Sequence, residues 1–230
     1  MSWTDNQAVE TIKKLRDIFK IETFLETGTF KGINARLHSF NFEEVITCEK
    51  IPEYFKEANR KLTFYSNVLC VHMDSKHFLK NFVRTYNEHK RKDIVFIYLD
   101  AHFYDKNLPK SKRFQVLDEL KELKNFKNCI ICIHDFDNGL GHITYDGISL
   151  DLDLIKKDLM NVNPNFKLYT NELSTCDIVK PTLKSIKDAN LSVDKETLDN
   201  LEYTWSSPRL TYRGILYALP KEVDINLKKI

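Results

Sequence analysis

The sequence predicts an α/β fold built on a doubly wound, mostly parallel β-sheet. Short apolar runs alternate along the chain with amphipathic segments whose apolar residues recur at helical spacing. Several of the apolar runs are continuous rather than alternating, which is typical of strands buried between two layers of helices. Strands of this kind, separated by helices, indicate parallel strands joined by helical crossovers.

Helices and strands alternate up to about residue 170. The first helix is expected over residues 5–19, where Val9, Ile12 and Leu15 recur at helical spacing. The strands expected after it cover residues 23–26, 44–48, 67–72, 93–99, 129–133, 166–170 and 214–219. The helices expected between the strands cover residues 32–40, 52–62, 75–86, 113–123 and an amphipathic segment through Ile148, Leu152, Ile155 and Leu159.

Residues 172–208 break this alternation. They are polar and lack a strong period, so we expect a substrate-side insertion there, with a surface decoration of no role as the open alternative. With 230 residues and 42% hydrophobic content, the chain is long enough for one sizeable core. We therefore expect a single domain over residues 1–230 that carries this insertion.

Charge and hydropathy argue against several kinds of partner. The 35 Lys and Arg residues nearly balance the 33 Asp and Glu residues, so no net charge draws the chain to nucleic acid or to an anionic membrane. No apolar run reaches the roughly eighteen residues of a membrane span, and the first residues do not have the pattern of a signal peptide. The five cysteines are odd in number, which is typical of reduced thiols rather than a disulfide framework. We expect a cytoplasmic protein.

Cys129 and Cys132 have the C-x-x-C spacing that also occurs in zinc and redox sites. They lie within one apolar run, however, and two strand residues three positions apart point to opposite faces of a sheet. A structural zinc site also needs a second pair of Cys or His ligands. The pattern therefore favours two buried thiols over a metal or redox site.

Residues that could hold a ligand lie where the predicted strands end, because open parallel sheets bind ligands beyond the carboxyl ends of their strands. The first strand runs into a turn with Gly28 and Gly32, which lets backbone amides approach a ligand, and Glu26 adds a carboxylate. The second strand ends at Glu49, whose carboxylate suits a ribose diol. Carboxylates repel phosphate, and the turn lacks the G-x-G-x-x-G spacing of dinucleotide sites.

The third predicted strand ends at Asp74 and Ser75, and the fourth at Asp100. Taken in order, the E-x-G-x-x-x-G turn and the acidic strand ends resemble the successive motifs of class I S-adenosylmethionine-dependent methyltransferases. This resemblance covers about residues 20–170 and implies a Rossmann-like methyltransferase fold, with a seven-stranded sheet whose last strand is antiparallel.

The same resemblance implies that S-adenosylmethionine is the cofactor. It places the turn around the methionine part, Glu49 at the ribose, and Asp74 with Ser75 by the adenine. The residues that we assign to the cofactor on this basis are Glu26, Thr27, Gly28, Thr29, Gly32, Glu49, Asp74, Ser75 and Asp100.

Two strand ends are dense in side chains that can bind a metal. Asp100 and His102 follow the fourth predicted strand, and His134 and Asp135 follow the fifth. Apolar runs flank all four residues, and ionisable groups left unpaired in such surroundings are costly. A hard divalent cation such as Mg²⁺ or Mn²⁺ would offset this cost, because carboxylates, water and substrate oxygens are its usual ligands.

These D-x-H-x-Y and H-D segments resemble those of metal-dependent sugar O-methyltransferases of the macrocin type, and more distantly those of catechol-type O-methyltransferases. The resemblance implies that Asp100 and Asp135 bind the metal, with His134 at a position that is often acidic. The third ligand stays open between Asp137 and Asn138. The metal ligands that we expect are Asp100, His134, Asp135 and Asp137.

We expect the chain to methylate a hydroxyl group of a sugar, a glycan or another small molecule. Asp100 and His102 are the expected catalytic residues, with His102 as the base, because imidazole can accept a proton near neutral pH. For His102, a place in the pocket wall or among the metal ligands is the open alternative. Neither nucleic acid nor a membrane is an expected partner, and a homo-oligomer stays open. The alternative functions are methylation of RNA, protein or a small amine, and non-catalytic cofactor binding.

Overall fold

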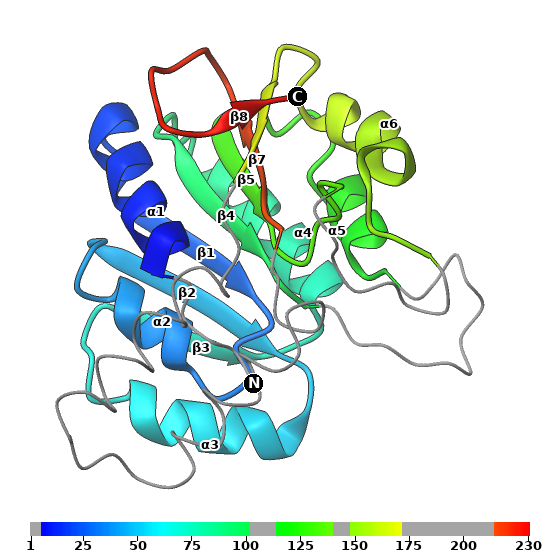
Figure 1. Ribbon diagram of the computed structural model, residues 1–230. Helices are drawn as coiled ribbons and strands as arrows, with labels where there is room; N and C mark the ends of the chain where they lie inside the picture. The colour runs from blue at the N-terminus through cyan, green and yellow to red at the C-terminus, as the bar shows by residue number, and fades with distance from the viewer. Residues whose placement is uncertain (1–5, 102–113, 140–147, 172–213) are drawn as a thin grey trace, which may run out of the picture.

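A mostly parallel sheet of eight strands forms the centre of the structure, a computed structural model that describes residues 6–101, 114–139, 148–171 and 214–230 (Figure 1). The strands are β1 (Thr23–Thr27), β2 (Glu44–Glu49), β3 (Val68–His72), β4 (Val95–Leu99), β5 (Cys129–Ile133), β6 (Lys167–Thr170), β7 (Leu216–Leu219) and β8 (Lys228–Lys229). Their order in the sheet is β3-β2-β1-β4-β5-β7-β6-β8. Strands β1 to β5 are parallel to one another, and β7 runs antiparallel to both β5 and β6. The predicted fold class is confirmed, with the two-residue β8 as an additional edge strand beside β6.

Six helices of the described segments cover the two faces of this sheet (Figure 1). They are α1 (Asn6–Phe19), α2 (Ile33–His38), α3 (Pro52–Leu62), α4 (Ser75–Glu88), α5 (Val116–Glu122) and α6 (Leu152–Val162). Residues of α1, α2 and α3 pack in one buried cluster around Phe24 of β1. Residues of α4, α5 and α6 pack in a second cluster that contains Leu25, the next residue of β1. Neighbouring strand residues therefore pack into the cores on opposite faces of the sheet, which explains why the strands are apolar throughout.

The C-x-x-C pair shows this alternation. Cys129 packs in the cluster under α4, α5 and α6, whereas Cys132 packs in the cluster under α1, α2 and α3. Both side chains are fully buried, and both are thiols rather than parts of a disulfide. The interpretation as two buried thiols on opposite faces of a strand is confirmed.

The topology gathers four strand ends at one edge of the sheet. The strand order reverses at β1, because the chain continues to β2 on one side and later returns to β4 on the other. The register pairs Thr27 with both Cys48 and Leu99, and it pairs Leu99 with Ile133. The carboxyl ends of β1, β2, β4 and β5 are thus level with one another, at the position where open α/β sheets bind ligands.

The structure corrects one element and leaves another outside the described residues. Helix α6 begins at Leu152 rather than near Ile148, because the side chain of Asp151 accepts the Leu154 N–H at 3.0 Å and caps the helix there. The predicted insertion over residues 172–208 lies outside the described residues. Each helix in the described segments falls short of the length and apolar character that a membrane span requires.

Candidate functional site

The glycine turn after β1 joins the backbones of β1, β2 and β4. The Gly28 and Thr29 N–H groups both donate to the Cys48 carbonyl oxygen at 3.0 Å. Gly28 has a left-handed φ of 83°. A Cβ atom at this position would lie 2.5 Å from the Asp100 carbonyl oxygen. Glycine is therefore required at position 28 by both conformation and space, and the turn lies directly against the backbone of Asp100.

Glu49, at the end of β2, is held by two backbone amides. Its Oε2 atom accepts the Phe30 N–H at 2.8 Å, and its Oε1 atom accepts the Ile51 N–H at 2.9 Å. Phe30 has a left-handed φ of 48°, a conformation that is strained for an aromatic residue, and its ring packs edge-on against Tyr54 with centroids 4.6 Å apart. Each carboxylate oxygen of Glu49 keeps a further lone pair that can accept a hydrogen bond from a ligand hydroxyl.

Glu26 is a buried acid beside this turn, with only 2% of its surface exposed. Thr47 donates its hydroxyl proton to Oε2 at 2.7 Å, and the Asn34 amide donates to Oε1 at 2.7 Å. Burial raises the pKa of Glu26, the two hydrogen bonds lower it, and the nearby charges of Asp100 and Glu49 raise it. Together these effects shift the pKa from 4.5 to about 8. The carboxyl group is therefore largely protonated at neutral pH.

Sequence reasoning missed the two residues that hold Glu26. Thr47 is a polar residue within the otherwise apolar middle of β2, and this interruption is the signal from which it could have been found. Asn34 gave no comparable signal, because polar residues are common in the first turn of a helix. Only the folded arrangement shows that α2 places this amide over Glu26.

Asp74 and Ser75 have a local role at the start of α4. The Oδ1 atom of Asp74 accepts the His77 N–H at 3.2 Å, and its Oδ2 atom lies 2.5 Å from the His77 Nδ1 atom. Partial burial alone would raise the pKa of Asp74, but the hydrogen bonds from His77 outweigh burial and lower it. Ser75 is buried as the first residue of the helix. Their predicted place beside the adenine stays a prediction.

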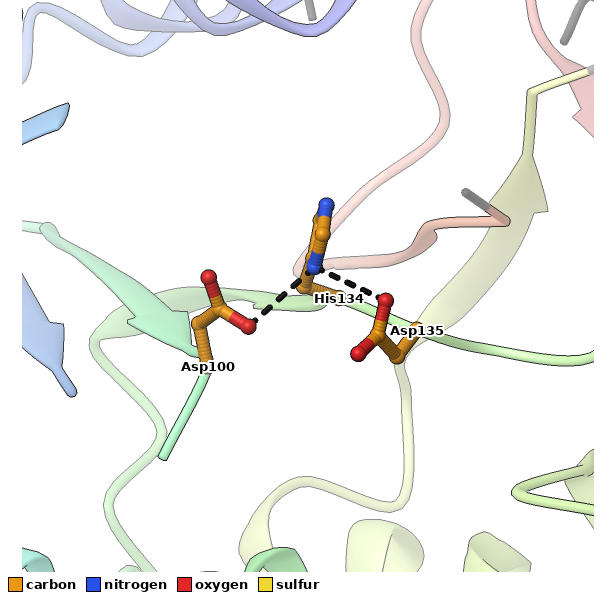
Figure 2. Close-up of side chains that lie close together, drawn as sticks. All are labelled: Asp100, His134 and Asp135. Atoms are coloured by element: carbon orange, nitrogen blue, oxygen red, sulfur yellow. Dashed lines mark hydrogen bonds and ion pairs between the residues drawn. The ribbon is translucent and has the colours of Figure 1, made fainter. Parts of the chain in front are cut away.

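Asp100, His134 and Asp135 gather beyond the ends of β4 and β5, with the His134 ring between the two carboxylates (Figure 2). The His134 Nδ1 atom lies 3.1 Å from Asp100 Oδ1 and 3.2 Å from Asp135 Oδ1. One possible ligand atom from each residue falls within a group no more than 4.8 Å across. Asp135 has a left-handed φ of 58°, an uncommon conformation that places its carboxylate toward His134.

The charge of this cluster differs from what the sequence suggested. Burial disfavours a charged imidazole, but the charges of Asp100 and Asp135, together with their hydrogen bonds, outweigh burial and raise the pKa of His134 to about 10. From the sequence alone, a bound cation was expected to pair these groups. In the folded chain, the protonated imidazole already pairs both carboxylates.

The same three residues also fit a divalent cation. Two carboxylates and one imidazole nitrogen are donors that Mn²⁺ accepts, and Mg²⁺ accepts the carboxylates. The buried position on two adjacent strand ends holds the donors close together before any ion binds. A cation here would take over the pairing that the His134 proton provides.

The structure does not bring the other predicted site residues that it describes, Asp137 and Asn138, into this cluster. The Asp137 carboxylate accepts the Gly139 N–H at 3.0 Å and is not part of the three-residue cluster. The Asn138 amide donates to the Asn171 carbonyl oxygen at 2.8 Å, which ties the loop after β5 to the end of β6. The third metal ligand therefore stays a prediction. His102 lies outside the described residues, so its role as a base also stays a prediction.

Gly214, before β7, is a further residue that sequence reasoning missed. A Cβ atom there would lie 1.9 Å from the Phe136 carbonyl oxygen, and the Phe136 N–H donates to the Gly214 carbonyl oxygen at 2.9 Å. This close approach holds the loop after β5, and with it Asp135, against the last part of the sheet. Its only signal in the sequence was a glycine before an apolar run.

The comparisons with known proteins identify the fold. No protein-family model matches the sequence, and no curated protein matches it. Phosphoethanolamine N-methyltransferase 2 from Haemonchus contortus, solved with phosphomonomethylethanolamine and S-adenosylhomocysteine, matches with a TM-score of 0.55 and 13% identity over 95% of this chain and 54% of that chain. This chain thus spans about half the length of that enzyme. An O-methyltransferase from Bacillus cereus, solved with S-adenosylhomocysteine, matches with a TM-score of 0.53 and 15% identity over 96% of this chain and 83% of that chain.

These two similarities establish the class of fold. The chain has the Rossmann-like fold of S-adenosylmethionine-dependent methyltransferases, as the motifs at its strand ends predicted. At 13% and 15% identity, these similarities show the fold alone.

Proposed function

We propose that this chain is an S-adenosylmethionine-dependent O-methyltransferase that uses a divalent cation, Mg²⁺ or Mn²⁺, to methylate a hydroxyl group of a sugar or glycan. The observation that carries the proposal is the position of Asp100 between two groups of residues. Its backbone N–H donates to the Thr27 carbonyl oxygen at 3.2 Å, beside the glycine turn, while its side chain contacts His134. A methyl donor at the turn and an acceptor at the cluster would therefore be neighbours.

The proposed roles follow the two halves of the site. The turn with Glu26 and Glu49 would bind the methionine and ribose parts of the cofactor, and Asp74 with Ser75 would lie by the adenine. Asp100, His134 and Asp135 would hold the cation. We also propose a cytoplasmic location and a small-molecule or glycan acceptor, rather than nucleic acid or a membrane.

Methyl transfer to oxygen requires an acceptor that has lost its proton and lies in line with the carbon to be transferred. A bound divalent cation supplies the first requirement, because it lowers the pKa of a coordinated hydroxyl group. The chain supplies the second, since Asp100 links the cation ligands to the backbone of the cofactor turn. His102 would then accept the hydroxyl proton.

A methyl-transfer assay with labelled S-adenosylmethionine tests the proposal. The acceptors should include simple sugars, glycans, a catechol, a phosphorylated ethanolamine and RNA, each with Mn²⁺, with Mg²⁺ and with a chelator. We expect transfer to a hydroxyl acceptor that requires the cation. Transfer to an amine or to RNA without a cation would favour the alternative acceptors, and cofactor binding without any transfer would favour a non-catalytic module.

Two substitutions separate the cluster from general charge effects. Asp135→Asn removes one proposed ligand and should lower the cation-dependent rate by at least about 10-fold. Asp153→Asn removes an exposed carboxylate in the first turn of α6 and should leave the rate unchanged. Equal rates for both variants would remove Asp135 from the proposed metal site.

His102→Ala tests the proposed base. With cofactor and cation saturating, we expect the turnover rate to fall by about 100-fold or more, as is typical when a general base is lost. A rate near that of the wild type would exclude His102 from proton transfer.

A further inference from the structure

Glu26 is a buried acid whose hydrogen-bond partners among the described residues are neutral. The Asn34 amide and the Thr47 hydroxyl each donate to one carboxyl oxygen at 2.7 Å. The Thr47 oxygen lies in turn 2.6 Å from the Thr29 hydroxyl oxygen, so the network continues into the glycine turn. No Lys or Arg side chain in the described part of the chain forms an ion pair with Glu26.

The charged groups that face Glu26 are themselves acidic. Burial raises its pKa most, Asp100 on the β4 side and Glu49 on the β2 side also raise it, and the resulting pKa is about 8. Among the described residues, Glu26 also interacts with two thiols and a phenol that have raised pKa values: Cys48, Cys70 and Tyr98. The described residues thus give Glu26 hydrogen bonds that suit a carboxylate but no positive charge to balance one.

We infer that the ammonium group of the bound cofactor replaces the proton on Glu26, so that cofactor binding releases one proton to solvent. The inference rests on the proposed function, because it takes S-adenosylmethionine or its product as the ligand at the glycine turn. The carboxyl O–H bond breaks, the proton leaves to the buffer, and the carboxylate pairs with an ammonium group that keeps all of its protons. An opposite charge within about 4–6 Å favours the ionised acid, and Asn34 and Thr47 already donate to its oxygens.

Calorimetric titration of the full chain with S-adenosylhomocysteine tests the inference without any turnover. The titration is run at pH 6 and pH 7 in buffers of different ionisation enthalpy, and the dependence of the heat on the buffer gives the number of protons released. We expect about one proton for the wild type, and a dissociation constant about tenfold lower at pH 7 than at pH 6, because binding and deprotonation are linked. Glu26→Gln should bind with a constant that is almost independent of pH and should release no proton.

Two controls isolate Glu26 and the ammonium group. Glu22→Gln, an exposed position just before β1, should release one proton as the wild type does. 5′-Methylthioadenosine, which has the adenosine but no ammonium group, should bind to the wild type without proton release. This ligand comparison needs no variant, so it holds even where Glu26→Gln does not fold.

Three results would overturn the inference while leaving the proposed cofactor in place: binding of S-adenosylhomocysteine without proton release, equal release by Glu26→Gln, or equal release with 5′-methylthioadenosine. If S-adenosylhomocysteine does not bind at all, the proposed function is overturned, and this inference with it.

Discussion

In the protein without ligand, the contribution of Glu26 to the free energy of unfolding falls as the pH rises. Its pKa is 4.5 in ordinary surroundings and about 8 in the folded chain, chiefly because of burial. Below pH 4.5 both the folded and the unfolded chain keep the proton. Between these two values only the unfolded chain releases it, so the contribution of Glu26 to the free energy of unfolding is lost step by step. The whole interval corresponds to about 5 kcal/mol.

We therefore expect Glu26→Gln to change the pH dependence of stability in the absence of ligand. Between pH 5 and pH 8, the wild type should lose about 3 kcal/mol of unfolding free energy relative to the variant, as measured by urea unfolding at each pH. The difference between the unfolding free energies of the two proteins at each pH does not contain the contribution of His134, because both proteins have this residue. Glu22→Gln should follow the wild type, and parallel curves for the wild type and Glu26→Gln would show that Glu26 ionises normally in the fold.

His38 has the opposite pH dependence. Its ring stacks on Phe24 with centroids 4.3 Å apart, and neither ring nitrogen has a hydrogen-bond partner among the described residues. Burial and, to a smaller extent, the charges of Lys13 and Arg16 lower the pKa of His38 from 6.5 to about 3. The folded chain thus holds a neutral ring, and it loses stability as the pH falls from 6.5 toward 3, where only the unfolded chain takes up the proton.

Replacing His38 with leucine, an apolar residue of similar volume, should remove this loss. We expect His38→Leu to keep more of its unfolding free energy than the wild type between pH 6.5 and pH 4, measured relative to each protein at pH 7. His89→Gln, at an exposed position after α4, should behave as the wild type. The prediction is wrong if the acid limb of the stability curve is the same in His38→Leu.

Gly28 and Gly139 form a matched pair for testing the contact between the β1 turn and β4. Both have a left-handed φ, 83° and 84°, so alanine is strained by a similar amount at each. A Cβ at Gly28 would meet the Asp100 carbonyl oxygen at 2.5 Å, whereas a Cβ at Gly139 would meet no atom of the described residues within 4 Å. Their comparison therefore separates backbone strain from the close approach of the two elements.

We expect Gly139→Ala to cost about 1–2 kcal/mol of unfolding free energy, from strain alone. Gly28→Ala should cost about 1–3 kcal/mol more, because the turn must move away from β4. Chemical denaturation measures both costs. If both variants lose the same unfolding free energy, the turn moves away from Asp100 at no additional cost.

Strand and helix positions were predictable because the apolar pattern that specifies them is local. Strand β5 and helix α3 have the bounds that periodicity and the proline at residue 52 gave. Strand β8 has no such signal, since Lys228 and Lys229 are exposed and form a strand only by pairing with β6. The start of α6 was misplaced because the apolar period extends to Ile148, while the capping side chain of Asp151 sets the true first turn.

The site was predictable to the extent that it depends on strand ends. Asp100, His134 and Asp135 were expected at one edge of the sheet and lie together there. That His134 bridges the two acids, and is charged as a result, depends on distances that no spacing along the chain encodes. In the same way, Thr47 reaches Glu26 only because the register of β1 and β2 pairs these two residues.

One continuous sheet with a core on each face connects the proposed cofactor turn to the rest of the molecule. The cluster under α1, α2 and α3 and the cluster under α4, α5 and α6 share the same strands, since neighbouring residues of β1, β4 and β5 alternate between them. Binding at the edge where these strands end should therefore stabilise both layers together, and unfolding should be one cooperative transition.

We expect S-adenosylhomocysteine at about 100 times its dissociation constant to add about 2.7 kcal/mol to the free energy of unfolding. For a chain of 230 residues this corresponds to a rise in Tm of about 5–10 °C, which calorimetry or circular dichroism can follow. Gly139→Ala should show the same rise from its own Tm, whereas Gly28→Ala should show little, because its turn no longer fits beside Asp100. A melting curve that splits in two, with the ligand moving only one part, would show that the two layers unfold separately despite the strands they share.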